Sequence, residues 1–249
     1  MNNKIGFSTG ATYSWDNSIN NQIQILKRID CNAIEISFGK ISDLDEEIQE
    51  ENIKYIRSLD YVSIHAPFFD DDRNDLYYEN NELIKEVLTK LAAICTRIDV
   101  KSVVFHPNLI KDYSVLENMN FCICLENMPI ERGFSIERLN DLMKKHLNYK
   151  LVLDTAHALS WDESSLSQLV VKFDNRISHI HFSDRRYSEL KKRVYDHQQV
   201  LFCEQMHKFD SLKELDCPII IEVSIKDKKN DINNLKEEFF TVEKFFSHI

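Results

Sequence analysis

Several features that identify whole classes of protein are missing from this sequence. No apolar run approaches the roughly 18 residues needed to cross a bilayer, and no charged-then-apolar signal stands at the N-terminus. With only four glycines and four prolines, the 249 residues contain no Pro/Gly/Ser-rich linker, and no internal repeat or low-complexity tract is present. We therefore expect a single domain over residues 1–249, cytoplasmic and without a membrane segment.

Paired cysteine motifs and an excess of positive charge are missing as well. The six cysteines lack the CxxC spacing of a zinc knuckle or a secreted disulfide framework, so we expect reduced and mostly buried thiols. They are Cys31, Cys95, Cys122, Cys124, Cys203 and Cys217. The formal net charge is −10, and such a field repels nucleic acid and anionic membranes, which argues against indiscriminate binding to either. A local basic patch remains compatible with this balance.

Short β-rich runs recur along the chain, with helical patterns between them. The runs cover residues 4–9, 33–37, 61–65, 102–106, 121–126, 150–154, 177–182 and 217–223. Apolar residues three and four apart predict helices at residues 81–98, 135–147 and 234–246. This alternation favours an α/β fold, a single-domain (β/α)8 TIM barrel, with an open doubly wound sheet as the main alternative.

Polar residues stand where six consecutive strands end. These residues are His65, His106, Glu126, Asp154, His181 and Glu222. In a parallel barrel the C-terminal strand ends share one face, so the six side chains would converge on one mouth. Period-two alternation places Glu126 on the same strand face as Cys122 and Cys124, which points it inward if the small thiols fill the barrel.

A cluster of this kind needs a cation or a dense hydrogen-bond network, because buried carboxylates and imidazoles are costly. A strand-end aspartate such as Asp154 is commonly the N-cap of the next helix. Within this set, however, we expect Asp154 to be a metal ligand, with His157 reaching the same mouth from the following turn. Imidazole nitrogen mixed with carboxylate oxygen suits zinc, with manganese and iron as alternatives.

The strand-end motifs resemble those of a known superfamily. HAPFF, FHPN, LENM, LDTAH, HFSD and IEV are similar to motifs of the xylose-isomerase-like TIM-barrel superfamily, and most closely to the endonuclease IV type (apurinic endonuclease family 2). The similarity runs from about residue 33 to residue 223. The resemblance implies two or three metal ions per chain. It implies one ion held by His65, His106 and a bridging Glu126, a second by Glu126, Asp154, His181 and Glu222, and a third by His157, Asp196 and His197.

The last pair of implied ligands departs from the family pattern. Family members usually have Asp-x-His followed by a glycine-containing turn, whereas Asp196 and His197 are adjacent and are followed by glutamines. Adjacent residues of an extended chain point to opposite sides. We therefore expect the third site to be the weakest, with Asp196 as its weakest ligand.

Three further residues near strand ends have two interpretations each. His179 shares a strand face with His181, so it either orients that residue or is a packed, hydrogen-bonded core histidine. Phe68 and Phe69 follow His65 closely and either stack on a base or sugar or lie buried under their loop.

A basic segment, DRRYSELKKR at residues 184–193, follows the seventh predicted strand. It carries Arg185, Arg186, Lys191, Lys192 and Arg193. The loops after strands seven and eight of barrel enzymes often hold phosphate, so we expect these side chains to bind a phosphate-containing substrate. The alternative is a solvated charged surface.

Two enzymatic functions are compatible with these residues. The resemblance implies a metal-dependent phosphodiesterase acting on damaged or abasic nucleic acid, with Glu126 as the shared ligand and Glu222 handling a proton. The alternative is a sugar isomerase or epimerase with one ion at the second site, in which these two glutamates move a proton beside a carbonyl and His157 contacts the sugar. Because a one-metal enzyme does not require His65 and His106, we favour the phosphodiesterase. A metal-retaining scaffold without catalysis is a third hypothesis.

Overall fold

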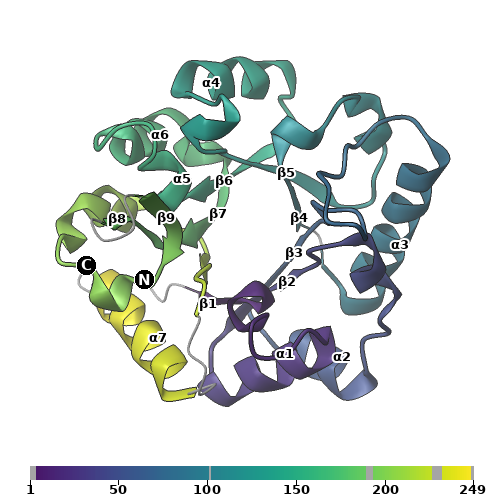
Figure 1. Ribbon diagram of the computed structural model, residues 1–249, viewed down its shortest axis with the longest axis horizontal. Coiled ribbons are helices and arrows are strands. Elements are labelled where there is room, and N and C mark those ends of the chain that lie inside the picture. Colours follow the sequence, from purple (N-terminus) through teal and green to yellow (C-terminus); the bar gives the residue numbers. More distant parts are fainter. Residues whose placement is uncertain (1–3, 101, 189–192, 226–231, 248–249) are drawn as a thin grey trace.

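Eight parallel strands close into a barrel, with helices around its outside (Figure 1). The computed structural model describes residues 4–100, 102–188, 193–225 and 232–247. The barrel strands are β1 (Ile5–Ser8), β2 (Ala33–Ser37), β3 (Tyr61–His65), β4 (Ser102–Phe105), β5 (Cys122–Glu126), β6 (Lys150–Asp154), β7 (Ile177–Phe182) and β10 (Ile219–Ile221). They pair in the order β1-β10-β7-β6-β5-β4-β3-β2. The predicted (β/α)8 barrel is confirmed, and the open sheet is excluded because the sheet closes.

Helices connect the strands. The α-helices are α1 (Ile19–Leu26), α2 (Glu50–Ile56), α3 (Glu82–Ile98), α4 (Ile136–Lys145), α5 (Thr155–Ala158), α6 (Ser165–Phe173) and α7 (Ile232–Phe246). The 3-10 helices are η1 (Thr9–Thr12), η2 (Lys27–Ile29), η3 (Ile41–Asp45), η4 (Pro107–Leu109), η5 (Tyr113–Leu116), η6 (Ile130–Arg132), η7 (Asp174–Arg176), η8 (Val200–Phe202) and η9 (Met206–Glu214). None of the helices in the described part of the chain is long and apolar enough to cross a membrane.

The longest helix, α3, illustrates how the local sequence sets its limits. Asn81 is the N-cap, and its side-chain oxygen accepts a hydrogen bond from the Ile84 backbone N–H at 2.9 Å. The helix ends where Asp99 adopts the left-handed conformation, with φ at +58°. Its buried face consists of Ile84, Val87, Leu88, Leu91, Cys95 and Ile98. This spacing of three and four residues is the pattern that predicted the helix.

The core has two parts. The larger lies between the strands and the helices, and the smaller lies inside the barrel, where Val104, Cys124 and Val152 are fully buried and Cys122 packs against them. The small thiols of β5 therefore do face the interior, as its alternation predicts. All six cysteines are free, with Cys31, Cys95 and Cys124 buried and the other three partly exposed.

The segment after β7 was predicted to be a loop, but it contains two further strands. Two strands, β8 (Asp184–Ser188) and β9 (Arg193–Gln198), pair antiparallel, with Asp184 opposite Gln198, and are called the hairpin below. Glu238 in α7 holds the turn that follows, because its carboxylate accepts hydrogen bonds from the backbone N–H groups of Val200 and Leu201 at 2.7 and 3.0 Å. The hairpin stands beside the barrel mouth and carries His197 toward it.

Candidate metal centre

The six strand-end residues do meet at the C-terminal mouth of the barrel. His65, Glu126 and Asp154 are the last residues of β3, β5 and β6. His106 follows β4 as the N-cap of η4, His181 lies in β7 opposite Asp154, and Glu222 directly follows β10. A cavity of about 330 Å³ opens here, and its lining includes His65, His106, Glu126, His157, His197 and Glu222. Closure of the parallel barrel brings these sequence-distant groups together.

A first cluster joins two histidines to Glu126. His106 Nε2 lies 3.0 Å and His65 Nε2 3.6 Å from Glu126 Oε2. His65 Nδ1 lies 2.9 Å from the carbonyl oxygen of Ala66, so donation of its Nδ1–H there leaves Nε2 as the free nitrogen. The ring of Phe68 stacks on His106 with centroids 5.2 Å apart. Both imidazoles are thus oriented toward the same carboxylate.

A second cluster consists of Glu126, Asp154, His181 and Glu222. One ligand atom from each of the four lies within 4.8 Å of the others. His181 Nδ1 lies 3.1 Å from Glu126 Oε1 and 2.9 Å from Glu222 Oε2. Among the described residues, Glu126 Oε2, Asp154 Oδ2 and Glu222 Oε2 are buried side-chain oxygens that accept no hydrogen bond of good geometry, although ring nitrogens of His106 and His181 lie 3.0 and 2.9 Å from the two glutamate oxygens. Three carboxyl groups therefore share a space that protein donors do not satisfy.

The pKa values of this cluster differ among its three carboxyl groups. Burial, together with the charges of Glu126 and Glu222, raises the pKa of Asp154 well above its usual value. Burial also opposes ionisation of Glu126, but the adjacent rings of His106, His181 and His65 hold its pKa well below its usual value. Burial disfavours the charged form of Glu222 as well, yet the charge of His181 contributes most to lowering its pKa to about 2. Two ionised carboxylates thus keep the third neutral, unless a cation joins them.

A third cluster contains Asp154, His157 and His197. Asp154 is both an N-cap and a member of the cluster, because Oδ1 accepts the His157 backbone N–H at 2.5 Å while Oδ2 is left without a partner. Nδ1 of His157 lies 3.5 Å from Asp154 Oδ1, and Nδ1 of His197 lies 3.8 Å from Asp154 Oδ2. Burial is the main reason why the pKa of His157 falls to about 3, so this imidazole is neutral, as a metal ligand must be.

Asp196 is not brought to the mouth, so the implied third ligand set is incomplete. Its carboxylate accepts a hydrogen bond from Arg185 at 2.7 Å, on the side of β9 away from the cavity that His197 lines. The contact with Arg185 holds Asp196 there, in a part of β9 whose pairing with β8 is irregular. His197 itself has φ at +52°, a left-handed backbone conformation that is uncommon outside glycine.

The arginines of the basic segment bind other parts of the chain. Arg185 donates to Asp196 at 2.7 Å and to Glu131 at 2.6 Å, and its side chain is only 11% exposed. Arg186 donates to Asp184 at 2.7 Å and to the backbone carbonyl of Gln199. These contacts stabilise the hairpin and occupy both guanidinium groups. Phosphate binding by the two arginines therefore stays a prediction. Lys191 and Lys192 lie outside the described residues, and so does the side chain of Arg193.

Phe68 and Phe69 separate two neighbouring cavities. Both are half-buried and line the 330 Å³ cavity, and both also line a second cavity of about 300 Å³. The second cavity is bordered by Tyr13, Lys40 and Arg73, and the two cavities share His197 and Glu222. The open space at the mouth thus extends from the clustered carboxylates toward the loops after β1, β2 and β3. It passes the rings of Phe68 and Phe69, which we call the aromatic wall.

The sequence interpretation missed a group of polar residues inside the barrel. Glu35 of β2 is fully buried and lies 3.1 Å from His181 Nε2. Ser63 of β3 donates to Glu35, and Tyr61 contacts His179. The sequence does carry one signal for this buried group. Glu35 is the only charged residue in the run AIEIS, and a charge in a strand buried on both faces requires a partner.

The mouth fits a divalent cation. Three buried oxygens accept no hydrogen bond of good geometry, the available ligand atoms are carboxylate oxygens and imidazole nitrogens, and several of them lie close together. Such a donor set suits zinc, manganese or iron. Glu126, Asp154, His181 and Glu222 would hold one ion, and the adjacent histidines extend the set. The identity and number of ions stay predictions.

Comparisons with known proteins give the fold and the family. No curated protein matches the sequence. A solved structure of a D-allulose 3-epimerase from Methylomonas sp. is 17% identical with a TM-score of 0.63, covering 98% of this chain and 97% of that one. A 3-keto-D-glucoside 4-epimerase from E. coli is 13% identical with a TM-score of 0.61, covering 97% and 99%.

A probable 3-DHS dehydratase from Bacillus anthracis is also similar, with 13% identity, a TM-score of 0.63, and coverage of 96% of this chain and 98% of that one. At these identities the structures demonstrate a shared fold alone. The model of a protein family described as "Xylose isomerase-like TIM barrel" matches residues 23–238. Since this match spans most of the sequence and the predicted strand-end motifs, the chain belongs to the xylose isomerase-like TIM barrel family.

Proposed function

We propose that this protein is a metal-dependent isomerase or epimerase of a small sugar. The observation that carries the proposal is the convergence of two glutamates on one histidine: His181 Nδ1 lies 3.1 Å from Glu126 and 2.9 Å from Glu222. The two glutamates come from strands on either side of β7, and Asp154 completes the cluster. Two carboxylates therefore flank the space in which a bound carbonyl compound would lie.

The chemistry of this reaction class matches those two groups. Isomerisation and epimerisation remove a proton from the carbon beside a carbonyl and return one at a different place, which requires a base and an acid. Glu126 and Glu222 would take these roles, and His157 and His197, which line the same cavity, would contact the sugar hydroxyls. A divalent cation held by the cluster would polarise the substrate oxygens.

The size of the site supports a small substrate. The cavity at the cluster has about 330 Å³ and the adjoining one about 300 Å³, values at the lower end of the range for small-molecule sites. The aromatic wall of Phe68 and Phe69 between them offers an apolar surface for the ring or carbon chain of a sugar.

The charge around the mouth also supports a small substrate over a long polyanion. The chain carries a net charge of −10, and the guanidinium groups of Arg185 and Arg186 are bonded to carboxylates or a carbonyl of the same chain. Nucleic acid affinity depends on cations that are free to contact phosphates. The similar structures include two enzymes named as sugar epimerases, which agrees with this substrate class.

A solvent-exchange assay tests the proposal. Protein reconstituted with Zn²⁺, Mn²⁺ or Fe²⁺ is incubated in D₂O with a panel of ketoses and aldoses, and deuterium at the carbon beside the carbonyl is followed by NMR. We expect deuterium incorporation with at least one sugar, and its loss in Glu126→Gln and in Glu222→Gln. Glu163→Gln, which changes an exposed glutamate, is the matched control. Exchange that is absent throughout, or that survives in both variants, would contradict the proposal.

A second candidate function is the endonuclease IV-like phosphodiesterase. It is favoured by the two additional clusters, His65/His106/Glu126 and Asp154/His157/His197, which a one-metal isomerase does not require. Phosphodiester hydrolysis of this kind uses two metal ions about 3.5–4 Å apart. Cleavage of an abasic-site duplex by the metal-loaded protein, assayed beside the sugar panel, separates the two functions.

A further inference from the structure

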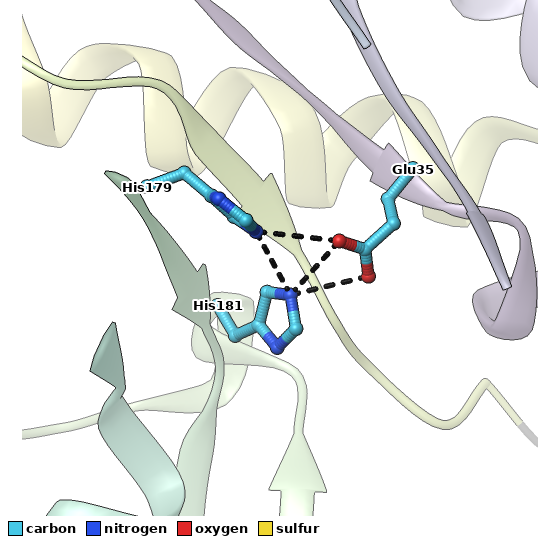
Figure 2. Close-up of side chains that lie close together, drawn as sticks. All are labelled: Glu35, His179 and His181. Carbon is cyan, nitrogen blue, oxygen red and sulfur yellow. Dashed lines mark hydrogen bonds and ion pairs between the residues drawn. The ribbon is translucent and has the colours of Figure 1, made fainter. Parts of the chain in front are cut away.

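A buried polar triad lies beneath the metal centre, inside the barrel. Figure 2 shows Glu35 facing two histidines of β7, His179 and His181, and all three are fully buried. His181 Nε2 lies 3.1 Å from Glu35 Oε1 and 3.2 Å from Oε2, and His179 Nε2 lies 3.3 Å from Oε2. The triad shares His181 with the candidate metal centre, but none of its other groups reaches the mouth cavity.

The two ring nitrogens of His181 face different surroundings. Nδ1 faces Glu126 and Glu222 at the mouth, whereas Nε2 faces Glu35. As a metal ligand His181 would be neutral and carry one proton, so a ring that donates Nε2–H to Glu35 would present the lone pair of Nδ1 to the mouth. The opposite tautomer would turn a lone pair against a buried carboxylate and would leave that carboxylate without its donor.

Glu35 is itself held by a chain of donors. The Ser63 hydroxyl donates to Glu35 Oε2 at 2.8 Å. Tyr61 OH lies 2.9 Å from His179 Nδ1, and if the hydroxyl donates there, His179 must carry its proton on Nε2, which faces Glu35. Glu35 then accepts from three donors, and every proton in the chain has an acceptor. Glu35 Oε1 accepts no hydrogen bond of good geometry, although His181 Nε2 lies 3.1 Å from it.

A buried metal ion in the triad is the competing explanation. The three atoms Glu35 Oε2, His179 Nε2 and His181 Nε2 are 3.2–3.3 Å apart, which is compatible with one face of a tetrahedral zinc site. An ion there would require His181 to ligate through both nitrogens once the mouth is also occupied, and hence to lose its last proton. The hydrogen-bonded arrangement requires neither step.

We propose that Glu35 is a positioning residue that fixes the tautomer and ring orientation of His181, so that Nδ1 serves as a metal ligand at the mouth. His179, Tyr61 and Ser63 hold Glu35 in place for this task. The inference rests on metal binding by the cluster in the proposed function, and it extends that function to a group that never touches substrate. Outer partners of this kind commonly change metal affinity about 10- to 100-fold when removed.

Metal affinity and a nuclear magnetic resonance signature together test the proposal. Zinc affinity of the full chain is measured by competition with a chelator for wild type, Glu35→Gln and Glu35→Leu. We expect about 10-fold weaker binding for glutamine, which keeps one acceptor oxygen, and about 100-fold for leucine. In zinc-loaded, ¹⁵N-histidine-labelled wild type, His181 is expected to show a metal-bound Nδ1 and a protonated, slowly exchanging Nε2, with assignment by His181→Asn. Glu35→Leu should lose the slow exchange.

Controls separate positioning from loss of folding. Glu238→Gln changes an equally buried glutamate in α7 and should leave zinc affinity unchanged, and thermal melting of each metal-free variant reports folding. If Glu35→Leu does not fold, Glu35→Gln and His179→Gln carry the test. The proposal would be overturned if folded Glu35→Gln kept wild-type zinc affinity. It would also be overturned if wild type bound a zinc ion within the triad and His179→Gln lost that ion. Zinc bound at His181 without proton exchange on any sugar would instead contradict the proposed function alone, and no zinc bound at His181 would overturn both.

Discussion

Charged side chains have different partners at the barrel mouth and in the hairpin beside it. In the hairpin, Arg185, Arg186, Asp184 and Asp196 pair with one another or with residues of neighbouring elements: Arg185 with Asp196 and with Glu131 of η6, and Asp184 with Arg186 and with Lys208 of η9. At the mouth, Glu126, Asp154 and Glu222 each have one buried oxygen that accepts no hydrogen bond of good geometry, and the basic groups beside these oxygens are histidines. The two regions are adjacent, because β9 carries His197 to the cavity.

The difference indicates which region serves function. Paired charges on a hairpin stabilise a conformation and need no ligand. Several carboxyl groups gathered in one buried cluster are costly to the folded state, and groups with strongly shifted pKa values in a cavity are typical of functional sites. Substitutions in the two regions should therefore differ in kind: those at the mouth should change metal binding and activity, and those in the hairpin should change stability.

The largest effect is expected from Glu126→Gln. This carboxylate contacts His106 at 3.0 Å and His181 at 3.1 Å, so its charge belongs to both neighbouring clusters. We expect the turnover number to fall about 10³-fold, the scale of a lost acid or base, and metal affinity to fall as well. Steady-state kinetics and elemental analysis measure the two effects. Unchanged turnover in a folded variant would remove Glu126 from the chemistry.

A pH effect is expected from Glu238, which holds the turn after the hairpin. Burial raises the pKa of this carboxyl to about 7 from 4.5. The folded protein therefore binds a proton that the unfolded chain has released between pH 4.5 and 7, so stability is highest below this window and falls as the pH rises through it. Since one pKa unit corresponds to about 1.4 kcal/mol, the full change is about 3 kcal/mol.

Denaturant unfolding of wild type and Glu238→Gln between pH 4.5 and 7.5 measures this slope. The slope should be present in wild type and much reduced in the variant, because glutamine does not titrate. Equal slopes in the two proteins would assign the pH dependence to other groups.

A smaller effect is expected from the double variant Arg185→Ala/Arg186→Ala. The substitution removes charge-assisted hydrogen bonds in a partly exposed hairpin, so the free energy of unfolding should fall by about 1 to 2 kcal/mol. The Michaelis constant for a free sugar should stay within about two-fold of wild type and should be insensitive to salt. A Michaelis constant that rises strongly with salt and with the double substitution would instead indicate a phosphate-containing substrate.

The smallest effect is expected from Asp196→Asn. Its carboxylate bonds Arg185 at 2.7 Å, outside the clusters at the mouth. We expect wild-type metal content and turnover, with a loss of stability of at most about 1 kcal/mol. Elemental analysis beside Asp154→Asn is the comparison, because that variant should lose metal. Equal loss of metal in both would restore Asp196 as a ligand.

The sequence predicts the barrel and the mouth well because both follow from local patterns. Strand-end residues such as His65 and Asp154 are recognisable where an apolar run stops, and a parallel barrel places all such ends on one face. The same reasoning cannot tell which strands oppose each other across the barrel. The contact between Glu35 and His181, 146 residues apart, depends on barrel closure and was therefore missed.

The hairpin was missed for a different reason. Its charged sequence reads as a solvated loop, because the alternation of a two-stranded ribbon with polar side chains on both faces carries no hydrophobic signal. Only its pairing shows that Arg185 is bonded to Asp196. Strand alternation predicts opposite orientations for Asp196 and His197, but the backbone is left-handed at His197 and the β8–β9 register is irregular there, so alternation alone does not explain them.

The most direct test of the mouth as a catalytic metal centre is the number of divalent ions that the reconstituted full chain retains after gel filtration, measured for wild type and Asp154→Asn. An isomerase centred on Glu126, Asp154, His181 and Glu222 should retain one tightly bound ion per chain, and the variant should retain none. No retained ion in wild type would contradict a metal centre. Two or three retained ions would contradict the one-metal isomerase and favour the phosphodiesterase.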